Sequence, residues 1–366
     1  MGSRVAISLY ALHLHASPLT VGVLISLYGL LPTLIAVSAG RLTDRIGARA
    51  PMLAGAILVA AGAAVPCVLP GLNPLYAAVV LIGLGFTIFQ ITVQNITGLI
   101  GEPRDRPANF SLLSLAYSVS AFAGPMLSGF AIDSAGYPIT FLLLALLALP
   151  TVAVLGANRL ALPRPRSQGP RNRQHRIADL LAHRELRSVL IITLLQVTSW
   201  ELFTFMMPVY GSGIGLSASS IGIVMGSFAV ALFLVRAALP FISRRIRPWP
   251  LIRTALRISA ATFVLFPLVT HVALLMMLAF ALGIGLGATQ PMVMALLHNA
   301  VPEGRTGEAV GLRASVVTTI QTATPLLFGA TAAAGFAYVF WSVAAALVLG
   351  SRTTKPQPRS SPGPSA

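Results

Sequence analysis

Residues 74–100 read PLYAAVVLIGLGFTIFQITVQNITGLI and contain no Asp, Glu, Lys or Arg. A helix rises about 1.5 Å per residue, so one of this length crosses a hydrocarbon core of about 30 Å. A similar stretch, VALLMMLAFALGIGLGATQPMVMALLHNA, occupies residues 272–300. Both stretches are continuously apolar and lack the period-two alternation of a membrane-spanning strand. They therefore predict transmembrane α-helices.

Apolar stretches of comparable length recur along the whole chain. Of its 366 residues, 56% are hydrophobic and only 9% are charged, whereas soluble domains carry about 25% charged residues. This composition excludes an ordinary soluble protein and predicts an all-α integral membrane fold. The predicted spans, twelve in number, are residues 1–14, 21–39, 51–69, 74–100, 110–132, 138–157, 188–209, 219–240, 251–270, 272–300, 309–330 and 333–350.

The net charge of +16 is explained by topology. Lys and Arg gather in alternate connections and in the tail, at residues 40–50, 101–109, 158–187, 241–250, 301–308 and 351–366. The intervening connections, residues 15–20, 70–73, 133–137 and 211–218, contain none. The positive-inside rule places the linker and the C-terminus in the cytoplasm and the spans in the plasma (inner) membrane. Nucleic acid is not an expected partner, because the Arg residues do not form one soluble face with interleaved aromatic side chains.

The chain repeats itself at a constant offset of 200 residues. The matching pairs are Tyr10 and Tyr210, Gly22 and Gly222, Gly83 and Gly283, Gly85 and Gly285, Gln90 and Gln290, Pro125 and Pro325, and Gly129 and Gly329. Gly and Pro are costly inside helices unless a close approach or a bend is required. The repeat predicts two six-helix halves, residues 1–157 and 188–350, joined by a basic linker, residues 158–187. Residues 351–366, rich in Pro and Ser, should form a disordered tail.

Residues 40–49, directly after the second predicted span, read GRLTDRIGAR. This stretch resembles the signature loop of the major facilitator superfamily, G-x-L-x-D-R-x-G-x-R, at Gly40, Leu42, Asp44, Arg45, Gly47 and Arg49. The resemblance implies two pseudo-symmetric six-helix bundles and a gate-stabilising charge network on the cytoplasmic side. Glycine permits a tight turn there, and Asp44 is suited to accept from cationic groups or a helix N-terminus. The competing interpretation is an ordinary basic topogenic loop.

Gly124, Pro125 and Gly129 in the fifth predicted span resemble the antiporter motif of the same family. The match is partial, because serine stands where two of the motif's glycines would be. The resemblance to the drug:proton antiporter type implies export. Plain helix packing explains a Gly-Pro pair in a membrane helix equally well.

Four hydrogen-bonding side chains lie on one face of the fourth predicted span, because their spacing is i, i+3, i+7 and i+10. They are Thr87, Gln90, Gln94 and Thr97. We expect this face to line a polar substrate cavity, and Gln290 in the tenth span extends the idea. The resemblance supports the cavity, because the first and fourth helices of each half surround the family's substrate path. A buried interhelical network is the alternative.

Glu201 is the only acidic residue deep within a predicted span. Thr198 and Thr204 lie on its side of the helix, and Trp200 adds apolar surface beside it. Burial disfavours an ionised carboxyl, so such a group takes up and releases a proton as water access alternates. We predict that Glu201 couples protons to transport. The alternative is a structural residue that is permanently protonated or paired with Arg4 or Arg236.

Arg4 and Arg236 each have an interpretation other than pairing with Glu201. Arg4 either binds an anionic substrate or is a terminal residue left outside the membrane, and the second interpretation is favoured. Arg236 lies one turn from the end of its span and is expected to snorkel to the interface. The first span should also be shorter than its repeat mate, because residue 188 projects to a position before residue 1. Either the true start lies upstream or one helix is half-built, and no cleaved leader is expected.

These observations predict a secondary active transporter that exports small, largely hydrophobic molecules by proton-coupled alternating access. A proton-coupled importer of sugars or organic acids is the alternative, and a non-transporting membrane sensor is a third. No enzyme is expected, because no catalytic set or phosphate loop is recognisable. No cofactor or metal is expected. The expected partners are a small-molecule substrate, protons and the lipid bilayer, and the protein should work as a monomer.

Overall fold

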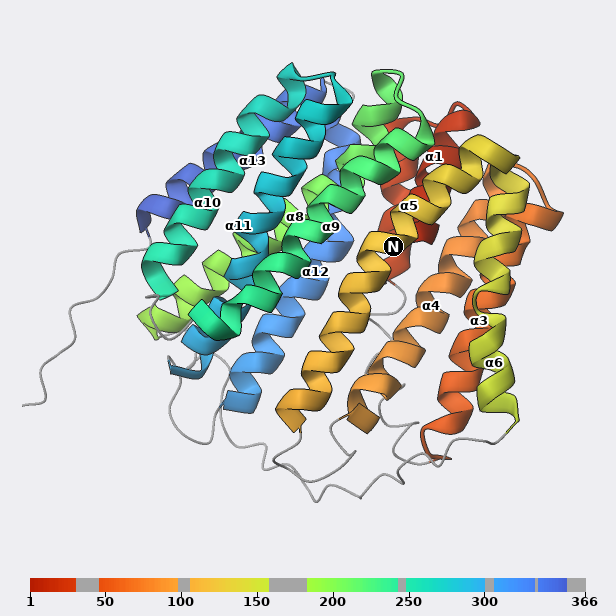
Figure 1. Cartoon of the computed structure of the whole chain (residues 1–366), viewed down its shortest axis with the longest axis horizontal. Coiled ribbons are helices and arrows are strands. Elements are labelled where there is room, and N and C mark those ends of the chain that lie inside the picture. The colour runs from red at the N-terminus through yellow and green to blue at the C-terminus, as the bar shows by residue number, and fades with distance from the viewer. Residues whose placement is uncertain are drawn as a thin grey trace, which may run out of the picture.

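The computed structural model describes residues 1–30, 46–97, 106–157, 183–242, 248–299, 306–332 and 335–353, and these residues contain no strand. The first part of the chain forms α1 (Gly2–His13), the helical segment Pro18–Leu30, α3 (Arg49–Val68), α4 (Leu72–Thr97), α5 (Arg106–Leu146) and α6 (Leu149–Gly156). The second part forms α8 (Arg184–Gly213), α9 (Ala218–Ile242), α10 (Pro248–Leu265), the 3-10 turn η2 (Phe266–Leu268), α11 (Val272–Asn299), α12 (Thr306–Ala332) and α13 (Phe336–Thr353). The helices stand side by side as one bundle (Figure 1).

Every predicted span coincides with helix in the described part of the chain, so the all-α fold is confirmed. The main differences concern helix ends. α5 continues through the predicted connection at residues 133–137, where only Gly136 leaves the helical region, with φ 80° and ψ 174°. A positive φ costs glycine little, so this one residue lets the chain reverse between the fifth and sixth spans. α8 begins at Arg184 rather than at residue 188, and α1 has 12 residues against 30 in α8, which confirms the shorter first helix.

The 200-residue offset extends from residue identity to tertiary contacts. A Cβ on Gly83 would lie 2.7 Å from the carbonyl oxygen of Tyr28, and a Cβ on Gly283 would meet the carbonyl of Phe228 in the same way. Because each glycine lacks that atom, α4 packs closely on the segment Pro18–Leu30, and α11 packs closely on α9. These repeated glycines therefore permit the same helix contact within each half.

A second set of repeated positions packs one half against the other. A Cβ on Gly222 of α9 would lie 2.7 Å from the carbonyl oxygen of Pro125 in α5, and one on Gly22 would meet the carbonyl of Pro325 in α12. Two neighbouring positions behave likewise, since Gly129 approaches Ala218 and Gly329 approaches Pro18. We call these paired contacts the glycine seam. The seam joins the halves along two pseudo-symmetric lines.

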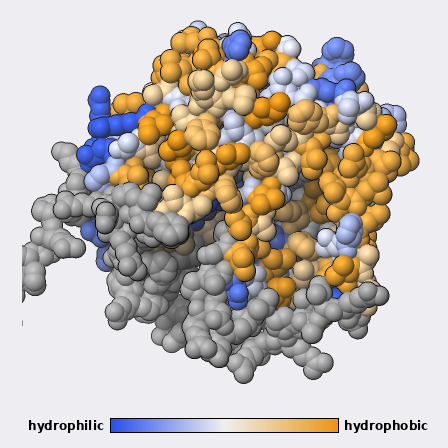
Figure 2. Space-filling model, in the orientation of Figure 1, coloured by the Kyte–Doolittle hydropathy of each residue, from blue (hydrophilic) through white to orange (hydrophobic). Residues whose placement is uncertain are grey.

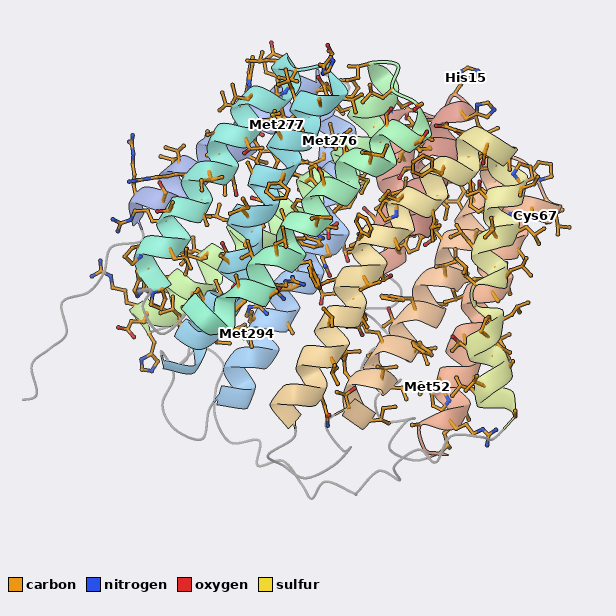
Figure 3. All side chains as sticks on the ribbon, in the orientation of Figure 1. His15, Met52, Cys67, Met276, Met277 and Met294 are labelled. Atoms are coloured by element: carbon orange, nitrogen blue, oxygen red, sulfur yellow. The ribbon has the colours of Figure 1, made fainter. Side chains whose placement is uncertain are left out.

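The glycine seam lies toward the end of the bundle whose connections contain no Lys or Arg. Tyr10, near the end of α1, accepts a hydrogen bond from the backbone of Gly71, and the Tyr210 hydroxyl donates to the backbone of Val269. The connections without Lys or Arg, residues 15–20, 70–73, 133–137 and 211–218, therefore lie at one end of the bundle. We call it the arginine-free end. His15 lies there, and Met52 lies near the opposite end (Figure 3).

The outer surface is apolar. Large hydrophobic side chains are exposed along several helices, among them Leu112, Met277, Leu327 and Leu349. Hydrophobic residues cover much of the visible face, and hydrophilic ones gather near its edges (Figure 2). The described residues include seven helices long and apolar enough to cross a membrane. Such a surface is unfavourable in water and favourable in lipid, so the chain is a multi-pass membrane protein.

Candidate functional site

A buried ion pair connects the two halves. The guanidinium Nη2 of Arg4 in α1 lies 3.3 Å from Oε2 of Glu201 in α8. The Glu201 side chain is 1% exposed and that of Arg4 is 24% exposed. The same guanidinium lies 5.9 Å from the ring centroid of Tyr28, a cation–π contact. The favoured expectation that Arg4 lies outside the membrane is wrong, because α1 carries it into the bundle beside the one carboxylate predicted to be deep.

The pairing makes the charge state of Glu201 matter for the contact between α1 and α8. Attraction between opposite charges is strong where the local dielectric constant is low, and removing one partner of a buried pair costs about 3–5 kcal/mol. The second oxygen of Glu201, Oε1, has no hydrogen-bond partner among the described residues.

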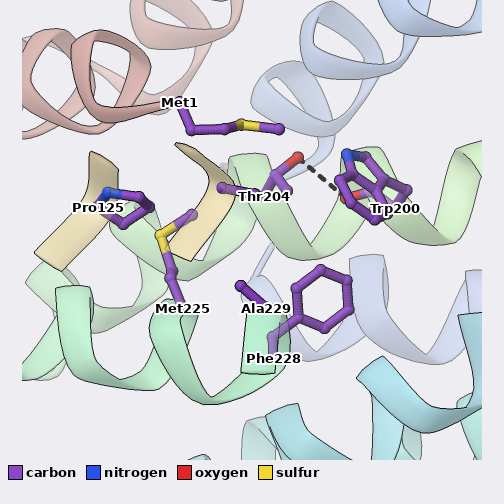
Figure 4. A pocket seen from close by; sticks show the side chains of 8 residues that line it. Met1, Pro125, Trp200, Thr204, Met225, Phe228 and Ala229 are labelled. Atoms are coloured by element: carbon purple, nitrogen blue, oxygen red, sulfur yellow. Dashed lines mark hydrogen bonds between the residues drawn. The ribbon is translucent and has the colours of Figure 1, made fainter. Parts of the chain in front are cut away.

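A small pocket lies between the two halves (Figure 4). Its lining residues are Met1, Ala121, Pro125, Trp200, Thr204, Met225, Phe228 and Ala229. The lining is apolar and aromatic except for the Thr204 hydroxyl, and that hydroxyl donates to the Trp200 carbonyl oxygen at 2.9 Å. The Trp200 ring packs edge-on against Phe228, with 5.2 Å between centroids. The pocket has a volume of about 10 Å³, so in this conformation it is a narrow apolar gap between the halves.

The structure brings some of the residues predicted from the eighth helix to this pocket. Trp200 and Thr204 line it, whereas Thr198 is half-buried and is not part of the lining. Pro125, singled out in the helix-five motif, also lines it. The pocket thus combines residues from both halves.

The polar face of α4 turns toward α5 of the same half. The phenol of Tyr117 interacts with the side-chain amides of Gln90 and Gln94. The Thr97 hydroxyl donates to the Val93 carbonyl of its own helix at 2.7 Å. Thr87 is half-buried, and Gln94 is exposed. These contacts form an interhelical network between α4 and α5, which is the alternative to a substrate-lining face.

Arg236 lies between the halves rather than at the membrane interface. Its Nη1 donates to Oγ of Ser118 in α5 at 3.2 Å, and its Nη2 donates to Oε1 of Gln290 in α11 at 2.9 Å. The expectation that it snorkels is therefore wrong. Sequence reasoning placed Gln290 near the cavity and named Arg236 only as a possible partner of Glu201 or a snorkelling residue, and it missed Ser118 and Tyr117. A signal for Arg236 existed, because Met225, Ala229 and Arg236 are spaced i, i+4 and i+11 on one helical face.

The loop motif is described only at its end. Gly40, Leu42, Asp44 and Arg45 lie outside the described residues. Gly47 has a φ of 84°, which suits the tight turn expected there. The Arg49 guanidinium donates to the carbonyl oxygens of Leu155 and Gly156 at the last turn of α6. A cation at a helix C-terminus is favourable, so Arg49 ties the start of α3 to the end of α6.

The helix-five motif forms close packing on two sides. A Cβ on Gly124 would lie 2.7 Å from the backbone nitrogen of Gly2 in α1. Pro125 and Gly129 contact α9 of the other half through the glycine seam. The motif therefore holds α5 against both the ion-pair helix α1 and the opposite half. Among the described residues, no group of three or more His, Cys, Asp or Glu side chains comes together to hold a metal.

Two curated proteins are similar in sequence to about a third of this chain. The chain is 32% identical over 109 residues to the multidrug resistance protein MdtH of Cronobacter sakazakii. It is also 32% identical over 108 residues to the class C tetracycline resistance protein of Escherichia coli. Each match covers 30% of this chain and 27% of the relative. The chain thus spans about a quarter of the length of the curated relatives it matches.

Solved structures match the fold over nearly the whole chain. The crystal structure of a POT family transporter in complex with a thioalcohol-conjugated peptide has a TM-score of 0.79 at 14% identity, covering 96% of this chain and 91% of that one. A structure of a POT family transporter with 5-aminolevulinic acid gives the same values. The sequence model of the Major Facilitator Superfamily matches residues 2–316 and 189–365. The chain therefore belongs to the Major Facilitator Superfamily.

Proposed function

We propose that this transporter exports small, largely hydrophobic molecules in exchange for protons, by alternating access. The observation that carries the proposal is the Arg4–Glu201 ion pair, which is buried and joins α1 of one half to α8 of the other. A proton-dependent contact between the two halves is the minimum requirement for coupling protons to their relative movement.

The ion pair supplies such a contact. With Glu201 ionised, its attraction to Arg4 holds α1 against α8. A proton on Glu201 removes the negative charge, so Arg4 loses its counter-ion and the halves separate more readily there. In an exporter, a proton that enters from outside would bind Glu201 and reset the carrier after the substrate leaves. Its release to the cytoplasm would restore the pair.

The chemistry of the pocket favours an apolar substrate. Its methionine and aromatic side chains offer adaptable, polarizable surface. The partial relatives are named for multidrug and tetracycline resistance, which is consistent with export. A proton-coupled importer remains the alternative, since the structural neighbours bind a peptide conjugate and 5-aminolevulinic acid. A sensor that moves no substrate is the third candidate.

The proposed orientation follows from charge. The arginine-free end faces the outside, and the linker, residues 158–187, and the tail, residues 351–366, lie in the cytoplasm under the positive-inside rule. The membrane is the plasma (inner) membrane. The transporter is proposed to act as a monomer of two halves, residues 1–157 and 188–350, with no nucleic-acid partner and no enzymatic activity.

Proteoliposomes with an imposed pH gradient test the proposal. The wild-type chain should move tetracycline against its gradient when protons flow the other way. Glu201→Gln keeps the shape of the side chain and removes its titration, so pH-driven transport should be abolished while substrate binding is retained. Glu185→Gln is the matched control, because Glu185 is an exposed residue of the same helix. Substrate-coupled uptake by intact cells would favour the importer, and absence of flux for any compound would favour the sensor.

A further inference from the structure

Arg236 is a charged group in the protein interior with only neutral partners in view. Its guanidinium donates to the Ser118 hydroxyl and to the Gln290 amide oxygen, which come from two other helices. The only ion pair among the described residues is the one between Arg4 and Glu201, so no described carboxylate neutralises Arg236. A partly buried cation without a counter-ion is unfavourable, and an anion that binds it would relieve that cost.

Arg236 shares one face of α9 with two residues of the apolar pocket. Met225 and Ala229 of α9 line the pocket, and Arg236 continues their face of the helix. The step from Ala229 to Arg236 is about 10 Å along the axis, at about 1.5 Å per residue. Long side chains in a helix lean toward its N-terminus, and the N-terminus of α9 is on the pocket side. The Arg236 side chain therefore reaches back toward Ala229.

The partner of Arg236 in α5 confirms this adjacency. Ser118 is one helical turn from Ala121, which lines the pocket. The bond from Arg236 to Ser118 thus places the guanidinium about one turn of α5 from the pocket residue Ala121. The Gln290 amide oxygen accepts a hydrogen bond from Arg236. The amide N–H groups of Gln290 do not bond to Arg236, because a guanidinium has no acceptor atom. The guanidinium also carries more N–H donors than these two contacts use.

We propose that Arg236 binds the oxyanion group of an amphiphilic substrate whose apolar body packs against Trp200 and Phe228 when the halves move apart and enlarge the pocket between them. The inference rests on the proposed transport function and names its substrate class: small organic anions with one sulfonate, carboxylate or similar group on a ring-sized apolar body. A guanidinium recognises such groups through paired N–H donors. Arg4 does not compete for the anion, because Glu201 neutralises it.

Two chemically matched probes test this assignment, 2-naphthalenesulfonate and its neutral amide, 2-naphthalenesulfonamide. They share the apolar body and differ in charge. Equilibrium binding is measured with the purified full chain in detergent. We expect the wild type to bind the sulfonate about tenfold more tightly than the sulfonamide, as is typical of a hydrogen bond to a charged group. Arg236→Gln should abolish this preference and leave sulfonamide binding unchanged, and Arg236→Lys should retain part of it.

The control is Arg257→Gln, since Arg257 is an exposed arginine of the same half; this variant should bind both probes as the wild type does. Thermal unfolding of each variant establishes that it is folded. Absence of sulfonate binding by the wild type, a preference that survives Arg236→Gln, or an equal loss of both probes would overturn the assignment. An equal loss would make Arg236 a bridge between the halves instead. Tetracycline flux, measured after the same protein is reconstituted into proteoliposomes, reports on the transport proposal separately, because neither probe enters that measurement.

Discussion

Asp133 caps the helix of the opposite half that begins beside Ser219. Its carboxylate accepts hydrogen bonds from the backbone N–H groups of Ser219 at 2.7 Å and of Ala218 at 3.1 Å, and it also accepts one from the Ser219 hydroxyl. Asp133 belongs to α5 and the capped residues open α9. Unsatisfied N–H groups and the positive end of the helix dipole attract a carboxylate there. The cap therefore reinforces the glycine seam at the arginine-free end.

We expect Asp133→Asn to shift the protein toward states that are open at the arginine-free end. Asparagine can still accept one hydrogen bond but loses the charge, and a charge at a helix N-terminus contributes about 0.3–1 kcal/mol. This corresponds to a shift in population of about two- to fivefold. Double electron–electron resonance between labels at Asn73 and His271, in a Cys67→Ser background, should report longer distances.

Ser134→Ala is the matched control for Asp133→Asn. Ser134 is the adjacent residue, and its hydroxyl donates to the Phe130 carbonyl of its own helix rather than across the halves. The control should leave the distance distribution unchanged. An identical distribution for Asp133→Asn and the wild type would show that the cap has no part in closing this end.

The repeated glycines should fall into two functional groups. Gly222→Ala places a methyl 2.7 Å from the Pro125 carbonyl across the seam, and Gly83→Ala places one 2.7 Å from the Tyr28 carbonyl within a half. We expect Gly222→Ala to open the arginine-free end with little loss of thermal stability, because the halves can separate. Gly83→Ala should instead lower the melting temperature, because helices within a half cannot separate without unfolding.

Gly156→Ala is the control for both substitutions, since no atom lies within 4 Å of its Cβ position. Thermal unfolding in detergent and the distance between Asn73 and His271 are measured on each variant. Equal losses of melting temperature for Gly222→Ala and Gly83→Ala would contradict the division into two groups.

The sequence predicted the helices and the special positions better than the contacts those positions make. Apolar length defines a span without tertiary information, and the 200-residue offset marked Gly22 and Gly222 as constrained. It did not reveal that each faces a proline carbonyl of the other half, because an offset relates positions within the sequence and not partners in space.

The candidate site was predicted where a residue was chemically unusual for its depth, or lay beside such a residue as Trp200 and Thr204 do. Glu201 stood out because an acidic residue in a span is costly, and Arg4 was one of its two candidate partners. Arg236 near a helix end looked like an interface residue until its bonds to Ser118 and Gln290 were seen. The pocket residues Met225 and Phe228 gave no signal at all, since an apolar side chain that lines a cavity has the same sequence pattern as one in a core.

Asp44 should matter for transport rather than for folding. It belongs to the part of the signature loop outside the described residues, so this prediction rests on the motif at residues 40–49 and on the family resemblance. A charge at a helix junction biases one state of a gate through local electrostatics. Asp44→Asn should therefore reach the membrane at near-normal abundance and show sharply reduced flux. Immunoblotting of membranes and proteoliposome flux give the two quantities, and normal flux would show that the family role does not extend to this chain.

The Arg4–Glu201 pair makes a further prediction about coupling. In Arg4→Gln the buried carboxylate has lost its cation, and an isolated buried charge is avoided by taking up a proton. We expect this variant to exchange substrate across the membrane without responding to an imposed pH gradient. Arg4→Lys keeps the charge and should retain part of the response. A full pH response in Arg4→Gln would mean that the pair does not carry the proton.

A double-mutant cycle on thermal unfolding separates a direct interaction from two independent effects. Arg4→Gln and Glu201→Gln each leave one partner of a buried pair alone, so each should destabilise the protein, by up to about 3–5 kcal/mol. The double variant leaves two neutral amides that can hydrogen-bond to each other, so it should be more stable than the sum of the single losses predicts. Residues in direct contact show coupling energies of about 0.5–3 kcal/mol.

Glu185→Gln combined with Arg4→Gln is the control and should give additive losses, because Glu185 is exposed and pairs with no described residue. If the Arg4 and Glu201 losses also add, the 3.3 Å contact contributes no energy of its own, and coupling must then depend on Glu201 without Arg4.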